Sequence, residues 1–208
     1  MHKLYFFDDF ENLSKQNLQQ YINSMPTDRI KKYNRYSTAK NKLNCLASYL
    51  LLWFALKQNF LIKSPPTFTY GSNQKPYITE NKNVFINMSH TNNCVICAIS
   101  DDEVGVDVEK IRPINLNISK KICTPSEQKL FHISSNKLNY LLEIWTKKES
   151  YVKMKSGNIF TGCSKINTTT LSNIHCFNHK NFIISVSSKK HNIVEPIEVF
   201  SSDILKLL

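Results

Sequence analysis

Two carboxylates, Asp107 and Glu109, have the residue type and spacing that most directly predict chemistry in this chain. They alternate with valines in the segment 104–109. Because strict alternation is typical of a β-strand, both carboxylates share one face of that strand and the valines point to the opposite, buried face. From spacing alone, a solvated strand face beside Lys110 is a competing interpretation, so a second element is needed to give the pair a role.

A second run places charged residues along one side of a predicted helix. Trp145, Glu149 and Lys153 follow one another at intervals of four residues, which brings them to nearly the same face. On an open surface, Glu149 and Lys153 would form an ion pair worth only ~0.3–0.5 kcal/mol. The apolar neighbours Ile144 and Val152 instead indicate that one side of this helix is buried. The three carboxylates then suit a hard cation, and the lysine one turn further on suits a phosphate.

Together, the two runs resemble the signature of the 4'-phosphopantetheinyl transferases, in particular the larger, monomeric kind that activates nonribosomal peptide and polyketide synthetases. The matching runs are GVDVE at residues 105–109 and WTKKESYVK at residues 145–153. Two shorter matches, NMSH at 87–90 and KP at 75–76, precede them in the family's order. The resemblance spans residues 75–157, and its strength comes from all four runs occurring at the expected separations.

The resemblance implies an enzyme that transfers the 4'-phosphopantetheine arm of coenzyme A to a serine of an apo acyl or peptidyl carrier protein and releases 3',5'-ADP. Such a phosphoryl transfer needs neutralised phosphate charge, a positioned nucleophile and a proton acceptor. The resemblance also implies Mg²⁺, with Mn²⁺ as an open alternative. Mg²⁺ prefers oxygen ligands and keeps waters and substrate phosphates in its shell, so a few protein carboxylates are enough.

Family precedent assigns roles to the residues of the two main runs. Asp107, Glu109 and Glu149 are the expected metal ligands, and Glu149 is also the expected general base for the acceptor serine. Proximity to the attacking hydroxyl supports that second role, because a carboxylate bound to a dication is a weak base. Lys153 is expected to stabilise the departing phosphate.

Coenzyme contacts are expected from several parts of the chain. The resemblance assigns them to Lys75, Ser89, His90 and Lys148, and the basic helical stretch that opens near residues 25–28 adds Lys31 and Lys42. On this side the sequence departs from the family. Gln74 stands where a glycine usually precedes the Lys-Pro step, the second proline is missing, and Asn44 competes with Lys42 for one basic position. These departures concern the adenine side of the coenzyme, not the metal site.

Another glutamate, Glu127, has two interpretations. Thr124, Pro125 and Glu127 form a strong helix-start pattern, in which the threonine caps the helix and the glutamate reaches back as a capping box. Capping, worth ~1 kcal/mol, accounts for this glutamate without chemistry. The resembled family often carries a glutamate near this position, so a place in the metal site stays open.

The order of predicted elements is similar in the two halves, and we expect an α+β fold. The first half reads as strands at 3–7, 67–70, 84–88 and 95–100 around an apolar helix at 43–60. The second half reads as a strand at 104–109, helices at 116–122, 126–133 and 138–155, and strands at 165–170, 174–177 and 182–187. A boundary near 101–103 separates an N-terminal half, 1–102, from a C-terminal half, 103–208, that carries the metal site. The resemblance implies a pseudo-twofold relation of two similar halves with the active site between them.

The charge of the chain favours anionic partners. The 208 residues include 27 Lys and Arg against 16 Asp and Glu, a formal net charge of +11, which attracts polyanions such as a phosphorylated cofactor or an acidic protein. A nucleic-acid-binding protein is a competing interpretation that no zinc-finger or RNP motif supports. Another is a degenerate homologue that binds carrier protein or nucleotide without catalysis. The intact carboxylates and lysine of the two main runs argue against it.

Hydropathy and cysteine usage indicate the compartment. No apolar run reaches the ~18 residues of a membrane span, and acids at positions 8 and 9 come too early for a signal peptide. We therefore expect a cytoplasmic protein, no membrane partner and reduced cysteines. Cys94 and Cys97 have the spacing of a metal half-site, but on a strand residues three apart point to opposite faces. The internal duplication favours a monomer.

Overall fold

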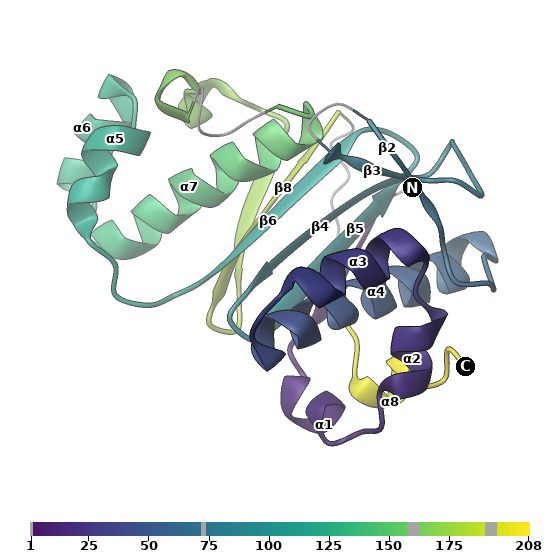
Figure 1. Cartoon of the computed structure of the whole chain (residues 1–208). Helices are drawn as coiled ribbons and strands as arrows, with labels where there is room; N and C mark the ends of the chain where they lie inside the picture. The colour runs from purple at the N-terminus through teal and green to yellow at the C-terminus, as the bar shows by residue number, and fades with distance from the viewer. Residues whose placement is uncertain (1, 72–73, 158–162, 190–194) are drawn as a thin grey trace.

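The computed structural model describes residues 2–71, 74–157, 163–189 and 195–208, and these form the predicted mixed α+β fold (Figure 1). The main sheet has the strand order β4-β5-β1-β9. Its members are β4 (Phe85–Thr91), β5 (Cys94–Ser100), β1 (His2–Phe7) and β9 (Ile197–Glu198). β5 pairs antiparallel with both β4 and β1, whereas β9 joins β1 in parallel.

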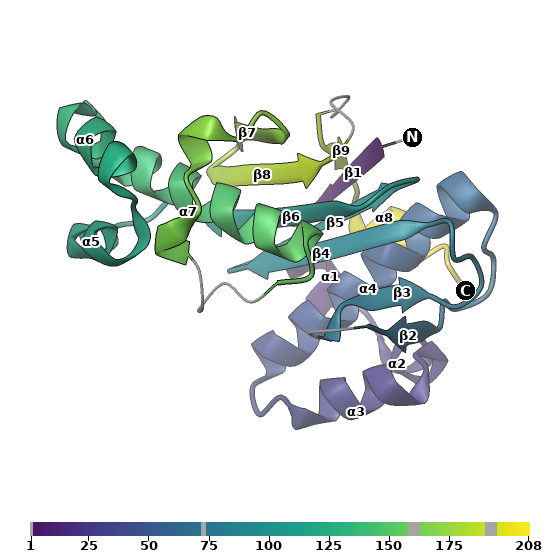
Figure 2. The ribbon, with the colours of Figure 1, turned by 90° about the horizontal axis from the view of Figure 1, so that it is seen from above.

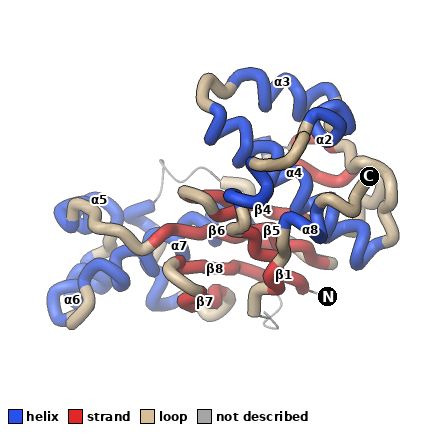
Figure 3. Tube along the Cα trace, turned by 90° about the horizontal axis from the view of Figure 1, so that it is seen from below, coloured by secondary structure: helices blue, strands red, loops and turns tan. Residues whose placement is uncertain are grey.

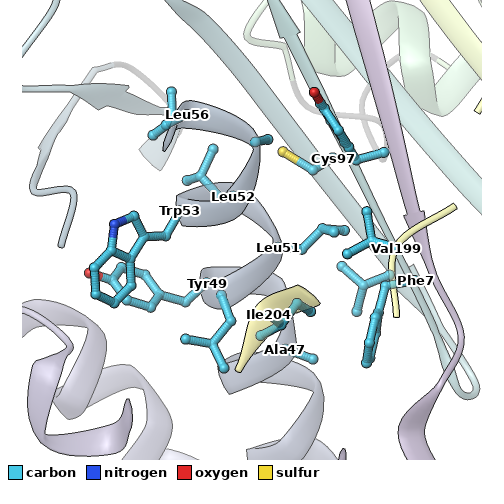
Figure 4. Packing of buried hydrophobic residues seen from close by; sticks show 14 of the residues in the cluster. Phe7, Ala47, Tyr49, Leu51, Leu52, Trp53, Leu56, Cys97, Val199 and Ile204 are labelled. Carbon is cyan, nitrogen blue, oxygen red and sulfur yellow. The ribbon is translucent and has the colours of Figure 1, made fainter. Parts of the chain in front are cut away.

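Helix α4 (Ala39–Phe60) lies against the main sheet and supplies much of the first core. The helix begins four residues before its predicted start at 43, and the side chain of Thr38 caps it by accepting a backbone hydrogen bond at 3.2 Å. Residues 44–53 are buried on all sides, as expected for a helix that is apolar all round. Leu51, for example, points toward Phe7 of β1 (Figure 4). Neither α4 nor any other helix within the described ranges has the length and apolar character needed to cross a membrane.

Three shorter helices and a small sheet complete the first half. The helices are α1 (Phe10–Ser14), α2 (Gln19–Ser24) and α3 (Thr27–Arg35), and the sheet pairs β2 (Phe68–Tyr70) with β3 (Pro76–Ile78). α3 lies beside α4 (Figure 1). The hydroxyl of Tyr70 donates to the carboxylate of Asp28, which ties the small sheet to the start of α3.

The second half is a three-stranded antiparallel sheet packed against one long helix (Figure 2). The strand order is β6-β8-β7, made of β6 (Val104–Lys110), β8 (Phe182–Ser188) and β7 (Ile174–His179). Helix α7 (Lys137–Met154) packs on this sheet, chiefly on β6 and β8. The short elements η2 (Leu116–Ile118), α5 (Ser119–Ile122) and α6 (Pro125–Ile133) gather near the start of α7.

One predicted strand, at 165–170, is wrong. This stretch instead contains the end of one turn of 3-10 helix, η4 (Cys163–Lys165), and the whole of another, η5 (Thr168–Thr170). The side chain of Asn167 accepts a hydrogen bond from the backbone N–H of Thr169 at 3.3 Å. Such a local bond gives the backbone an alternative to a sheet ladder, which the β-branched threonines alone did not indicate.

The two halves share a core where their sheets face each other. Leu4 and Ile96 of the main sheet belong to one buried cluster with Val106 and Ile184 of the second sheet. β4 lies next to β6, and the side-chain oxygen of Asn87 accepts a hydrogen bond from the backbone N–H of Val106 at 2.9 Å. This junction brings the predicted residues of both halves together.

The end of the chain departs from the predicted division at residue 102. β9 and helix α8 (Ser201–Ile204) pack with the first half, next to β1, α1 and α4 (Figure 3). Val199, Ile204 and Leu207 are buried in the first core. The segment 197–207 is therefore physically part of the N-terminal half. The pseudo-twofold relation of the halves stays a prediction.

Candidate active site

A pocket of about 770 Å³ lies at the junction of the two halves. Its walls come from α3 and α4, the small sheet, β4 and β6, and α7. The lining includes a basic group on α3, namely Arg29, Lys31, Lys32 and Arg35, and an acidic group on β6 and α7, namely Asp107, Glu109 and Glu149. Ser89, His90 and Lys153 line the pocket as well. The pocket can therefore receive a ligand with anionic groups and hold a cation at its other end.

Close contact between β6 and α7 brings the carboxylates of the acidic group together at one end of the pocket. A Cβ on Gly105 would overlap the backbone carbonyl oxygen of Ser150 and the backbone of Met154, so only glycine allows this approach. Behind the strand, the hydroxyl of Ser150 hydrogen-bonds Ser187 of β8 at 2.8 Å. α7 thus lies directly on the sheet, in a register that turns Glu149 toward the pocket.

Asp107 is the most tightly surrounded carboxylate. It is 5% exposed, and its Oδ1 accepts hydrogen bonds from Ser89 Oγ at 2.8 Å and from Lys153 Nζ at 2.6 Å. Lys153 Nζ also donates to Ser89 Oγ at 3.0 Å. Oδ2 of Asp107 is buried and has no hydrogen-bond partner among the described residues. A buried charged oxygen without a partner is costly, so this atom is a candidate ligand atom.

Glu109 and Glu149 lie half-buried beside Asp107. Burial, and next the negative charge of Asp107, raise the pKa of Glu109 above its usual value. Burial also raises the pKa of Glu149; Lys153 opposes this shift, and Asp107 and Glu109 add to it. Lys153 Nζ is 4.0 Å from Glu149 Oε2, too far to neutralise it fully. The acidic group therefore carries negative charge that a cation would offset.

The acidic group fits a magnesium ion in chemistry but is not assembled as a finished cluster. The three carboxylates, among them that of Asp107 with its unpaired Oδ2, supply the hard oxygen donors that Mg²⁺ prefers. Within the described residues, no three His, Cys, Asp or Glu side chains are grouped closely enough to hold a metal ion as they stand. The ammonium of Lys153 is the cation beside Asp107 in this arrangement.

The basic group contains a buried guanidinium and an ammonium whose pKa is lowered. Arg29 is 4% exposed, its Nε has no hydrogen-bond partner in the described part of the chain, and its guanidinium lies 5.1 Å from the ring centroid of Phe68. Burial, and next the charge of Arg29, lower the pKa of Lys32. Anionic groups would relieve both effects, so this end of the pocket suits phosphates.

His90 lies between the two groups. Burial lowers the pKa of its imidazole, and the charges of Lys32 and Lys153 lower it further against the opposing effect of Asp107. The ring is therefore neutral near pH 7. Its place between the basic helix and Lys153 agrees with the predicted phosphate contact, which stays a prediction.

The structure places three of the residues predicted to contact the coenzyme outside the lining of this pocket. Lys148 has a fully buried side chain that forms an ion pair with Glu127, away from the pocket. Lys75 is 7% exposed and donates to the carbonyl oxygen of Met154 at 3.0 Å, where it binds the C-terminal end of α7. Lys42 is not among the pocket residues, and its Nζ lies 5.5 Å from the ring centroid of Tyr33. Basic character in the sequence did not reveal the direction in which these side chains point.

Glu127 takes the capping role, not a metal role. Thr124 and Glu127 form the predicted capping box at the start of α6. The carboxylate of Glu127 is fully buried and does not line the pocket. The sequence predicted a basic stretch here, but not that Arg29, Lys32 and Arg35 line the pocket. Their signal was the spacing of Arg29 and Lys32, three residues apart, on one face of a short helix.

A second pocket of about 540 Å³ adjoins the first and shares Glu109 and Trp145 with it. Its walls are the segment from Arg112 to Ile122 and the start of α7. Apolar side chains dominate this lining: Ile114, Ile118, Ile122, Leu141 and Leu142.

Comparison with known proteins finds one family to which this chain is similar. Residues 103–196 match the family model described as 4'-phosphopantetheinyl transferase superfamily. Among its relatives, 4'-phosphopantetheinyl transferase Sfp of Bacillus subtilis (strain 168) is 25% identical over 146 residues, which cover 69% of this chain and 65% of Sfp. 4'-phosphopantetheinyl transferase gsp of Aneurinibacillus migulanus is 28% identical over 145 residues, covering 68% of this chain and 55% of gsp. The matches thus span somewhat less than two thirds of the length of these relatives.

Proposed function

We propose that this protein transfers the 4'-phosphopantetheine arm of coenzyme A to a serine of an apo acyl or peptidyl carrier protein and releases 3',5'-ADP. The observation that carries the proposal is one pocket that combines a basic group and a carboxylate group. Phosphoryl transfer needs both, because phosphate charge must be held and the nucleophile must lose a proton. The match to the superfamily model supports the same reaction.

In this proposal the coenzyme phosphates bind the basic end of the pocket. Arg29, Lys31 and Lys32 supply the positive charge there, together with Arg35. Ser89 and His90 line the same pocket, and Ser89 accepts a hydrogen bond from Lys153 at the acidic end, where we expect the pyrophosphate to bind. The guanidinium of Arg29 lies over the ring of Phe68 and its Nε has no hydrogen-bond partner among the described residues, so a phosphate would supply one.

At the acidic end, Asp107, Glu109 and Glu149 would hold Mg²⁺, which neutralises the charge of the pyrophosphate when bound. Glu149 accepts the proton of the acceptor hydroxyl as the serine oxygen bonds to the β-phosphorus. The bond from that phosphorus to the bridging oxygen breaks, and 3',5'-ADP leaves with the electron pair. Lys153, held by Asp107 and Ser89, is placed to stabilise the departing phosphate.

The experiment that tests the proposal is direct. The protein is incubated with coenzyme A, Mg²⁺ and a panel of apo carrier proteins, and intact mass reports the added arm on the carrier. The expected result is modification of at least one carrier, and loss of modification when its acceptor serine is replaced by alanine. Modification of no carrier, together with thermal stabilisation by coenzyme A and Mg²⁺, would favour a binding protein without catalysis.

A further inference from the structure

One buried ion pair has no part in the chemistry proposed above. Lys148 and Glu127 have no exposed side-chain surface, and Lys148 Nζ lies 2.7 Å from Glu127 Oε2. Burying two charges is costly, and apolar side chains of similar volume often stabilise a protein at least as well. The bonds of this pair must therefore offset that cost by holding neighbouring segments of the chain in one place.

Lys148 uses its whole ammonium group. Besides the bond to Glu127, Nζ donates to the carbonyl oxygens of Ile122 at 2.5 Å and of Cys163 at 3.0 Å. An ammonium has three hydrogens, so none is left over. The lysine thereby ties the end of α5 and the turn η4 to the middle of α7.

Glu127 completes the network from the other side. Its Oε2 accepts from the backbone N–H of Thr124 at 2.7 Å, and its Oε1 accepts from the backbone N–H and the hydroxyl of Thr168, both at 2.8 Å. The carboxylate thus joins the start of α6 to η5. The partners on both sides are mostly backbone groups of irregular segments, which a polar network can hold in one position.

The segment held in this way is a wall of the second pocket. Ile114, Ile118 and Lys121 line that pocket from the connection between β6 and α6, opposite Leu141 and Trp145 of α7. The buried apolar cluster under this wall is small and consists of Ile122, Cys123, Phe131, Leu141 and Ile144. The bond from Lys148 to the carbonyl oxygen of Ile122 therefore adds a direct polar tie between the wall and α7.

We propose that Lys148 and Glu127 are a positioning pair, which holds the wall formed by η2 and α5 and so sets how the acceptor protein approaches Glu149. This inference rests on the proposed function. Coenzyme A would fill the basic end of the main pocket, which leaves the side of the second pocket for the acceptor. That pocket reaches the acidic end through the shared residues Glu109 and Trp145.

Three variants separate positioning from simple stabilisation: Lys148→Met, Glu127→Gln and the double variant. Each single change leaves a buried group without its partner, whereas the double change removes both charges. We expect the single variants to lose thermal stability and the double variant to regain much of it. In the double variant, KM for the apo carrier should stay raised by roughly 10- to 100-fold, since small displacements of positioning groups have effects of this size. KM for coenzyme A should change by less than about twofold, because the basic end of the pocket keeps its contacts.

A matched control uses the pair Glu143 and Lys147 of the same helix, whose charges lie 3.6 Å apart and are partly exposed. The double variant Glu143→Gln/Lys147→Met should leave both Michaelis constants unchanged. If KM for the carrier returns to the wild-type value in the Lys148→Met/Glu127→Gln variant along with stability, the pair acts on folding alone and the proposal is wrong.

Hydrogen exchange provides a readout that needs no activity. The double variant Lys148→Met/Glu127→Gln should exchange the backbone amides of residues 114–124 faster than the wild type, while those of α3 stay unchanged. Unchanged exchange at 114–124 would overturn the positioning role even if the wild type proves to modify no carrier protein. A failed transfer assay with accelerated exchange would instead count against the proposed function alone.

Discussion

Asp107 has two oxygen atoms in very different surroundings. Oδ1 binds Ser89 and Lys153, whereas Oδ2 is buried without a partner in the described structure. The carboxylate is therefore held in place by one oxygen and has the other available. A residue kept in this way contributes to function at a cost in stability.

Replacing Asp107 with alanine should separate activity from stability. The variant loses the bonds of Oδ1 but also the unpaired Oδ2, so the fold should be kept and the melting temperature should shift only slightly. Turnover should fall by roughly 10²–10³, the usual effect of removing one electrostatic stabiliser. Circular dichroism and the rate of carrier modification at limiting Mg²⁺ measure the two effects. Near-wild-type turnover in a folded variant would place the metal site elsewhere.

The two helix residues should respond differently from each other. Glu149→Gln keeps the size of the side chain and removes its basicity, so turnover should fall by ~10²–10⁴, the usual range of general acid–base catalysis. Lys153→Met should lower turnover with less effect on KM for the carrier. Normal turnover with weakened carrier binding in the Lys153 variant would assign this lysine to docking instead.

Spacing along the chain predicted which residues of the two main runs share a face. The alternation around Asp107 and the four-residue steps to Glu149 and Lys153 both led to side chains that line one pocket. Spacing did not predict the direction of the Lys148 side chain. This residue precedes Glu149, and neighbouring residues on a helix point about 100° apart. Whether that side meets solvent or another element is decided by tertiary packing, which in this case placed Glu127 there.

At the scale of the elements, β6 and α7 approach each other closely at Gly105. Gly105→Ala would force a Cβ into the backbone of α7, so the strand and helix must separate. We expect a loss of stability of about 1–3 kcal/mol, typical of overpacking, and a large loss of turnover because Asp107 moves away from Lys153. Gly157→Ala is the control, since its Cβ would meet the side chain of Val152 at 3.3 Å and needs only a small adjustment. Equal denaturation midpoints for both variants would contradict the close approach.

The network between α6 and α7 predicts a pH dependence. Burial raises the pKa of Glu127, but the hydrogen bonds from Lys148, Thr124 and Thr168 outweigh burial and hold the pKa below its usual value of 4.5. A carboxyl whose pKa is lower in the folded state stabilises the fold above the unfolded-state pKa, and this contribution is lost as pH falls through the folded pKa. The difference in melting temperature between wild type and Glu127→Gln should therefore be largest near pH 7 and shrink as the pH falls below 4.5. A difference that is constant with pH would exclude an ionised Glu127.

Regular elements were predicted better than irregular ones. The predicted helix at 138–155 is α7 within one residue at each end, because its apolar period and its length are both strong signals. The turns at 163–170 were misjudged because side-chain bonds of Asn167 decide them, and β-branched composition carries no information on such bonds.

The whole molecule carries a formal charge of +11, which leads to a test by salt. Carrier proteins of the kind proposed are expected to be acidic around the acceptor serine, so rising ionic strength should raise KM for the carrier and leave saturated turnover nearly unchanged. KM for coenzyme A should be less sensitive, because phosphates enclosed between Arg29 and Lys32 are screened less. A salt series at fixed free Mg²⁺ measures both constants. If KM for the carrier protein stays constant from low to physiological salt, the basic surface does not contribute to docking.

The path of the chain through the molecule has a consequence for how the protein is made. Val199, Ile204 and Leu207 complete a core whose other members come from the first half of the chain. The ribosome therefore releases the first half long before its missing side chains are available, and this half waits with α4 and the main sheet incompletely covered. The sheet of the second half is translated before these side chains, and its buried cluster also needs Leu4 and Ile96 of the first half. The core of the half that is translated first is therefore completed last, and we expect its apolar surface to need protection during synthesis.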